Sequence, residues 1–169
     1  MARLAELNAL DLQGFVAALG AIFEHSPWIA ERAHARHPFA DRAALLDAMT
    51  DVIARAGEGE KLALLRAHPD LAGKLARAGA LTAHSTGEQA SAGLDRLSEH
   101  EYRRFTALND AYKARFGFPF IIAVRENTKA SILAAFERRL DHDRAQEFDA
   151  ALTEVAKIAR IRLAALIED

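Results

Sequence analysis

The chain has 169 residues, of which 51% are apolar and 27% charged, and its net charge at neutral pH is −2. This length suits one domain with a hydrophobic core, and the mixed charges give no reason to expect a nucleic acid or a membrane as partner. The lack of cysteine excludes disulfides, thiolate nucleophiles and cysteine-based zinc sites. Without an apolar run long enough to span a bilayer or a signal-peptide core, we expect a cytoplasmic protein.

Alanine, leucine, arginine and glutamate dominate the chain and β-branched runs are scarce, which favours helices throughout. Apolar residues at helical spacing predict a first helix over residues 12–23. Ser26 and Pro27 have the pattern of an N-cap and a first helical residue. Asp41 is expected to cap a further helix that ends near Gly57.

In the second half, a short helix is expected within residues 70–78. Three longer helices are predicted: one from Ser98, with Glu101 completing a capping box, to Gly117, one from Asn127 or Thr128 to about Leu140, and one from Asp143 onward. Only residues 118–124 begin in a way that is not helical, because they contain Pro119 and β-branched residues. The sequence therefore predicts an all-α fold of about eight to ten helices, in a single compact domain over residues 1–169.

His68 is the first candidate for chemistry. Proline disfavours the helical conformation of the residue before it, so Pro69 should end the preceding helix at or near His68. A helix C-terminus and the nearby Asp70 both favour the charged imidazole and raise its pKa, which suits a proton donor near neutral pH. The alternative is that His68 only caps the last carbonyls of its helix.

Ser85, Thr86, Gly87, Glu88 and Gln89 form the second candidate group. The spacing of serine and glutamate is that of a capping box, and the glycine allows a close backbone approach. Residues 86–88 would then present N–H groups at a helix N-terminus, where a carboxylate or a ureido carbonyl could bind. The alternative is that the serine and the glutamate only cap each other.

The third group is the extended stretch 118–124 with Arg125 at its end. An extended apolar segment leaves backbone N–H and C=O groups that a small planar ligand could pair with. Arg125 is suited to a bidentate hold on a carboxylate. The alternative is a buried connector, with Arg125 paired to Glu126 or to a neighbouring helix. His34 and His37 have a spacing that can bind metal, but no third ligand is evident and we expect no metal site.

Taken together, the motifs resemble those of the 2-oxo-4-hydroxy-4-carboxy-5-ureidoimidazoline (OHCU) decarboxylase family of urate degradation. The segments that carry the resemblance are His68-Pro-Asp-Leu71, Ser85-x-x-Glu88-Gln89, Phe116-Gly-Phe-Pro-Phe120 with Arg125 downstream, and Phe23-Glu-His-Ser-Pro-Trp28. Each motif alone is weak, but all of them occur in order and at matching separations. The resemblance covers nearly the whole chain.

The resemblance implies an all-helical, usually homodimeric carboxy-lyase that converts OHCU to (S)-allantoin and CO₂ with no metal or organic cofactor. By match to the family's motifs, His68 would be the catalytic acid, Glu88 would orient His68 or the substrate, and Arg125 would hold a substrate carboxylate or carbonyl. The residues implied to line the substrate site are Pro69, Ser85, Thr86, Gly87, Glu88, Gln89, Phe120, Ile121, Ile122, Ala123 and Val124. Two alternatives stay open at this point: a non-catalytic helical scaffold of the urate pathway, and an enzyme of the same fold acting on a related ureido-imidazoline.

Overall fold

A computed structural model describes residues 1–168 of the chain, and ten α-helices lie within them. The prediction of an all-α fold is confirmed. No helix in the described residues is both long enough and apolar enough to cross a bilayer. Contacts divide the chain into two compact units: Met1–Ala67 together with the residues from Ala156 onward, and His68–Val155. One domain over the whole chain stays a prediction, which a single cooperative unfolding transition would support.

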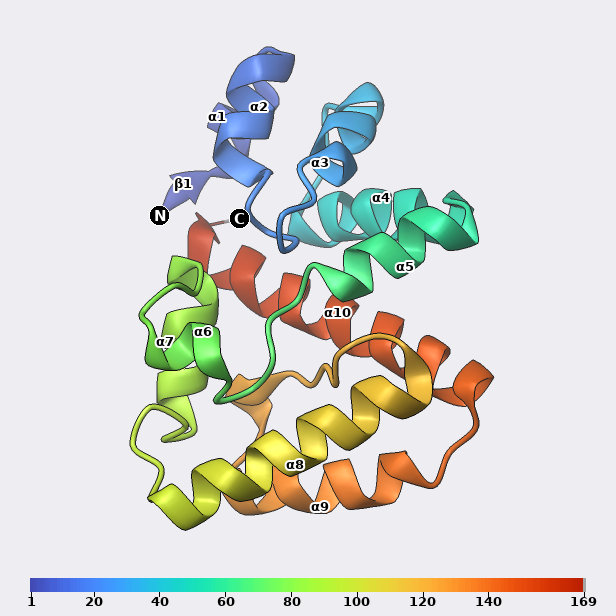
Figure 1. Cartoon of the computed structure of the whole chain (residues 1–169). Coiled ribbons are helices and arrows are strands. Elements are labelled where there is room, and N and C mark those ends of the chain that lie inside the picture. The colour runs from blue at the N-terminus through green and yellow to red at the C-terminus, as the bar shows by residue number, and fades with distance from the viewer. Residues whose placement is uncertain (169) are drawn as a thin grey trace. The chain divides into compact units, whose positions relative to one another are not determined.

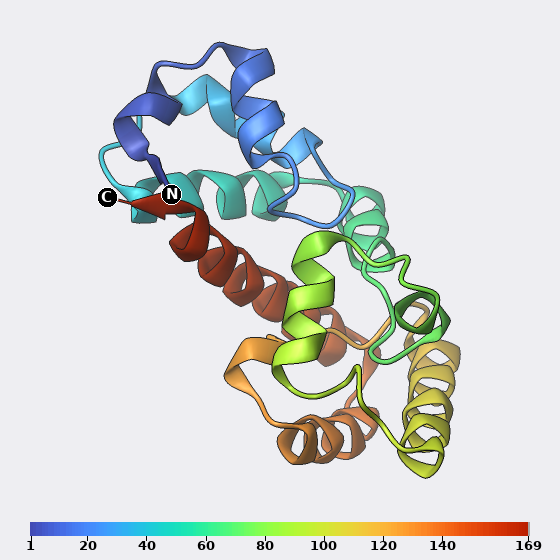
Figure 2. The same ribbon diagram turned by 90° about the vertical axis from the view of Figure 1, so that its left-hand side faces the viewer.

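The first unit is a group of helices, and its first and last segments pair as a two-stranded parallel sheet. Its elements are β1 (Ala2–Arg3), α1 (Leu4–Asn8), α2 (Leu12–Leu19), α3 (Trp28–Ala33), the 3₁₀ helix η1 (His34–Arg36), α4 (Arg42–Arg55), α5 (Glu58–Arg66), the last part of α10 (Arg144–Leu166) and β2 (Ile167–Glu168). The strand pairing brings the first residues of the chain beside β2, which directly follows α10 (Figure 2). Helix α3 packs against both α2 and α4.

Two sequence expectations in this unit need correction. Helix α2 ends at Leu19, although Ile22 and Phe23 continue the apolar pattern and are buried. They reach the core from a loop, so apolar periodicity extended the predicted helix too far. Ser26 is also not an N-cap, because its hydroxyl donates to the carbonyl of Glu24 and α3 starts only at Trp28. Asp41, by contrast, caps α4 as predicted.

The second unit holds every predicted site residue. Its elements are α6 (Lys74–Arg77), α7 (Ala83–Ser91), α8 (Glu99–Phe116), the 3₁₀ helix η2 (Val124–Glu126), α9 (Lys129–Leu140) and the first part of α10. Ser98 and Glu101 form the predicted capping box, Gly117 ends α8 with a φ of 80°, and Thr128 caps α9. Helices α8 and α9 lie side by side (Figure 1).

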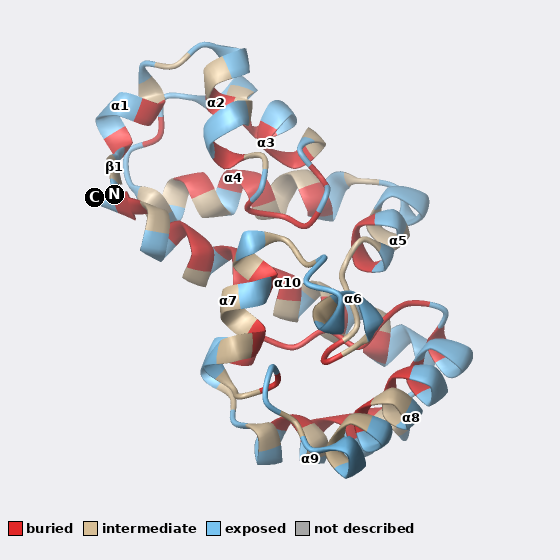
Figure 3. Ribbon diagram, turned by 60° about the vertical axis from the view of Figure 1, so that its left-hand side comes forward, coloured by how far each residue is buried: buried red, intermediate tan, exposed pale blue. Residues whose placement is uncertain are grey.

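The stretch between α8 and η2 lies outside any α-helix or strand, in agreement with the predicted non-helical start of this segment, and it is buried throughout residues 118–124 (Figure 3). Phe120 stacks on Phe136 of α9 with 3.7 Å between ring centroids. Tyr112 of α8 meets the Phe120 ring edge to face at 5.4 Å. This aromatic packing holds the stretch between the two helices, where it can serve as a fixed wall for a site.

Candidate functional site

His68 lies just beyond the end of α5, which stops at Arg66 with Ala67 as its C-cap. The prediction that the helix ends at or near the histidine is confirmed, and the side chain is half-buried. Asp70, expected to favour the charged imidazole, has another partner: its carboxylate lies 2.6 Å from Nζ of Lys113. The structure therefore assigns this carboxylate to an ion pair with α8.

The start of α7 differs from the prediction. Thr82 is the N-cap, its side chain accepts from the N–H of Ser85, and its carbonyl accepts from the N–H of Thr86. Ser85 thus lies inside the first turn, so the expected capping box with Glu88 does not exist. The expectation of open N–H groups at residues 86–88 is wrong for the same reason, because the helix begins at Ala83. Thr82 competes for the cap from three residues upstream, and local spacing alone cannot decide between the two.

Helix α7 contacts two of the other predicted segments. A Cβ added at Gly87 would lie 3.2 Å from Nη2 of Arg125, so the guanidinium passes directly over the glycine. Gln89 lies on a different side of the helix and bonds to residues 70 and 72, just after His68–Pro69. Helix α7 therefore joins the segment that follows the histidine to η2, which carries the arginine.

Gln89, predicted to line the substrate site, is 4% exposed and uses both ends of its amide within the protein. Its Oε1 accepts from the N–H of Ala72 at 2.9 Å, and its Nε2 donates to the carbonyl of Asp70 at 3.2 Å. These bonds make Gln89 a support for the loop after His68.

Arg125 is exposed, and no carboxylate within residues 1–168 pairs with it. The open alternative of an ion pair with Glu126 is therefore not realised in the described part of the chain. A guanidinium held over a glycine and left without a protein carboxylate is suited to binding a carbonyl or carboxylate of a ligand.

Several backbone groups of residues 118–124 already have hydrogen-bond partners inside the protein. The carbonyl of Ile121 accepts from Nη1 of Arg139 at 2.7 Å. The N–H of Ala123 donates to Glu154 at 3.1 Å, and its carbonyl accepts from the side-chain amide of Asn127 at 2.9 Å. A flat ligand could therefore pair only with the other backbone N–H and C=O groups of this stretch.

Residues 120–124 also contact a buried polar network that was not predicted from the sequence. Glu147 of α10, 0% exposed, accepts from Nε of Arg139 at 2.8 Å and from the hydroxyl of Tyr112 at 2.5 Å, and its other oxygen lies 2.9 Å from Nδ1 of His142. The Arg139 guanidinium also lies over the Phe120 ring, 4.4 Å from its centroid. Burial, followed by the hydrogen bond to Glu147, raises the pKa of Tyr112. The sequence signal was present but unspecific: Arg139 occupies an apolar position of a predicted helix.

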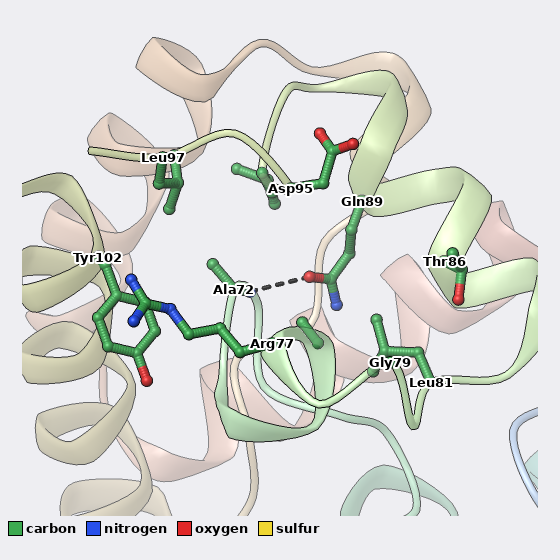
Figure 4. Close-up of a pocket in the computed structure, with 11 residues that line it drawn as sticks. Ala72, Arg77, Gly79, Leu81, Thr86, Gln89, Asp95, Leu97 and Tyr102 are labelled. Carbon is green, nitrogen blue, oxygen red and sulfur yellow. Dashed lines mark hydrogen bonds between the residues drawn. The ribbon is translucent and has the colours of Figure 1, made fainter. Parts of the chain in front are cut away.

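A cavity of about 360 Å³ opens on the side of α7 that carries Thr86 and Gln89 (Figure 4). Leu81, Leu94 and Leu97 give it an apolar lining, and Arg77 lies over the ring of Tyr102 at its edge. Gln89 points from α7 toward Ala72 at one side of this cavity (Figure 4). Of the predicted site residues, Thr86 and Gln89 line this cavity, whereas His68, Glu88 and Arg125 are not among its lining residues.

His34 and His37 stack on each other with 4.2 Å between ring centroids. Each ring also contacts a backbone carbonyl, Leu10 for the first and His34 for the second. No group of three potential ligands that could hold a metal occurs among residues 1–168.

Comparison with known proteins agrees with the motifs. The family model for OHCU decarboxylase matches residues 8–164. The chain is 47% identical over 161 residues to the 2-oxo-4-hydroxy-4-carboxy-5-ureidoimidazoline decarboxylase of Haloferax volcanii, covering 95% of this chain and 94% of that protein. It is 43% identical to the uric acid degradation bifunctional protein PucL of Bacillus subtilis, covering 97% of this chain and 32% of that protein.

A solved structure of similar fold has been described as (S)-allantoin synthase. It superimposes with a TM-score of 0.80 at 33% identity, over 99% of this chain. The chain spans 54% of that solved chain. With a family model that matches most of its length and relatives of this similarity, the chain belongs to the OHCU decarboxylase family.

Proposed function

We propose that this protein decarboxylates OHCU to (S)-allantoin and CO₂ in urate degradation. The observation that carries the proposal is the place of α7, which contacts Arg125 through Gly87 and the residues after His68 through Gln89. One helix thus links three of the motif segments of the family. The names of the relatives support the choice of substrate.

The substrate itself supplies the path for the electrons. OHCU carries a carboxylate and a hydroxyl on one ring carbon, next to an imine carbon. When the bond to the carboxylate breaks, its electron pair passes into the imine, CO₂ leaves, and an enol-like intermediate remains. The reaction therefore needs no metal or organic cofactor as an electron sink.

The protein's tasks are to hold the ring, to orient the carboxylate out of its plane and to protonate one face. His68 is the proposed acid, and general acid catalysis by a well-placed group contributes about 10²–10⁴-fold. The fixed wall of residues 120–124 would determine which face of the ring meets the imidazole. Glu88 is proposed to orient His68 or the substrate.

Arg125 is proposed to hold a carbonyl of the ureido group or the ring at least as much as the carboxylate. A tight hold on the leaving carboxylate would stabilise the ground state and oppose its loss. For Arg125→Lys we expect a large rise in KM with little change in kcat, measured by initial rates. A fall in kcat at constant KM would place Arg125 in the chemical step instead.

The test of the proposal uses fresh OHCU, generated in the cuvette from urate by urate oxidase and hydroxyisourate hydrolase. Circular dichroism follows the appearance of optically active (S)-allantoin. We expect rapid formation with the wild-type protein, none with His68→Asn, and full activity with His100→Asn, which alters an exposed histidine of α8. Slow racemic product unchanged by the wild-type protein would favour a scaffold, and activity retained in His68→Asn would remove the histidine from the mechanism.

We further expect a cytoplasmic homodimer, on the strength of the family resemblance. Sedimentation equilibrium of the purified protein measures the oligomeric state, and fractionation of the producing cells measures the location.

A further inference from the structure

The turn that follows His68–Pro69 is held by side chains at three successive residues. Two of these bonds come from Gln89, which binds the carbonyl of Asp70 and the N–H of Ala72. The third comes from Asn109 of α8, whose Nδ2 donates to the carbonyl of Leu71 at 2.8 Å. The backbone of residues 70–72 is thus bound by amides from two different helices.

This turn needs such support. Ala72 has a φ of 52°, a left-handed conformation that is unfavourable for a residue with a Cβ. Leu71 and Ala72 are both buried, so their polar backbone groups must find partners inside the protein. The two amides supply those partners and hold the turn in a conformation that its own residues disfavour.

Asn109 is present for its donor alone. It is 2% exposed, and its Oδ1 accepts no hydrogen bond from the residues that the structure describes. A buried acceptor without a partner destabilises a fold, and a leucine at this position would avoid that cost. The bond to Leu71 is therefore the contribution that an apolar residue of similar size could not make.

We infer that Asn109, together with Gln89, is a positioning residue for His68. His68 lies only two residues before the turn, so a shift of the turn moves the imidazole relative to the bound ring. A misplacement of about 1 Å in a catalytic group can cost about 10²-fold in rate. This inference rests on the proposed function, in which His68 protonates one face of the intermediate.

Lys113 offers a matched control on the same helix, one turn beyond Asn109. It contacts the same segment through the side chain of Asp70 at 2.6 Å, but both side chains are partly exposed to solvent. Lys113→Met removes this contact and leaves all three bonds to the backbone of the turn intact.

The experiment compares Asn109→Leu with Lys113→Met in the OHCU assay, at an enzyme concentration at which turnover is faster than the spontaneous decay of OHCU. For Asn109→Leu we expect kcat to fall about 10–100-fold, KM to change little and the enantiomeric purity of the allantoin to drop, because His68 meets the ring less exactly. For Lys113→Met all three should stay near wild type. Unchanged kcat and enantiomeric purity in a folded Asn109→Leu protein would overturn the inference.

A second measurement does not depend on turnover. The ring resonances of His68, assigned by their loss in His68→Asn, should shift in the NMR spectrum of Asn109→Leu and stay in place in Lys113→Met. Inactive wild-type protein would refute the proposed function, while this spectrum still decides whether Asn109 positions the imidazole; unshifted resonances would refute the positioning role. If Asn109→Leu does not fold by far-ultraviolet circular dichroism, Asn109→Ala replaces it in both measurements.

Discussion

Two backbone segments of the candidate site are held by side chains of opposite character. Residues 70–72, next to His68, are bound by the neutral amides of Gln89 and Asn109. Residues 120–124 are bound largely by charged groups, with Arg139 on the carbonyl of Ile121 and Glu154 on the N–H of Ala123. A neutral amide gives a directional bond without a buried charge. A buried charge gives a stronger bond but must itself be neutralised by further partners.

The two kinds of support make the two segments sensitive to different substitutions. Loss of a neutral bond leaves one peptide group unpaired in the interior, at about 1–3 kcal/mol. Loss of one member of a buried ion pair leaves the other charge without compensation, at about 3–5 kcal/mol. Loss of one supporting side chain should therefore destabilise the protein more at residues 120–124 than at the turn after His68.

The largest effect is expected for Arg139→Met, which leaves the fully buried Glu147 without its arginine. Urea unfolding should show a free energy of unfolding lowered by about 3–5 kcal/mol. Arg139→Lys keeps the charge but loses the geometry that binds Glu147 and Ile121 together, and it should raise KM more than it lowers kcat. Arg138→Met, on the exposed side of α9, is the control. An unchanged urea midpoint in Arg139→Met would refute the fragility of the charged support.

Tyr112→Phe removes one bond to the same carboxylate and keeps the aromatic packing. Because the lost hydrogen bond goes to a charged group, the free energy of unfolding should fall by about 1.5–3 kcal/mol. Burial raises the pKa of Tyr112 above that in the unfolded chain. Its contribution to stability should thus be full below about pH 10 and be lost only as the pH rises further. A wild-type advantage that disappears already at neutral pH would contradict this.

Gly87→Ala acts on the helix between the two segments and should separate stability from activity. Alanine is favoured over glycine within a helix by about 0.5–1 kcal/mol, so thermal unfolding should move to higher temperature. The new Cβ would lie 3.2 Å from Nη2 of Arg125 and displace the guanidinium, so KM should rise. A higher melting temperature with unchanged KM would show that Arg125 does not need this position.

The smallest effect is expected for Lys113→Met. The ion pair with Asp70 is partly exposed, and such pairs contribute about 0–1 kcal/mol. Chemical denaturation should show a change within this range that vanishes in high salt. A larger loss would mean that charge supports the turn as well, and the contrast between the two segments would fail.

The features that the sequence predicted correctly are those decided within a few residues. Asp41, Ser98 and Thr128 each cap a helix through an N–H three residues away, so the pattern alone reveals the bond. The non-helical start of the stretch after Gly117 was also predictable, because a proline and β-branched residues follow a helix stop. The prediction of the N-cap of α7 was wrong because Thr82 and Ser85 are both favourable cap residues and lie three residues apart.

The supports of the site were not predictable from local pattern. Asn109 and Leu71 are separated by 38 residues, and Tyr112 and Glu147 by 35, so only the folded chain brings each pair together. The available signal was a polar residue in an apolar stripe: Asn109 follows the buried Phe105 by one helical turn. Such a signal identifies a buried polar group but not its partner.

The two hydrogen bonds of the Gln89 side chain have a consequence for hydrogen exchange. Its amide binds an N–H and a C=O of the same turn, as the edge of a neighbouring strand would. The amide proton of Ala72 lies outside any helix or strand, yet it is buried and bonded. It should therefore exchange with deuterated solvent as slowly as the helical amides around it, and mark the turn beside His68 as one of the last parts of this unit to open.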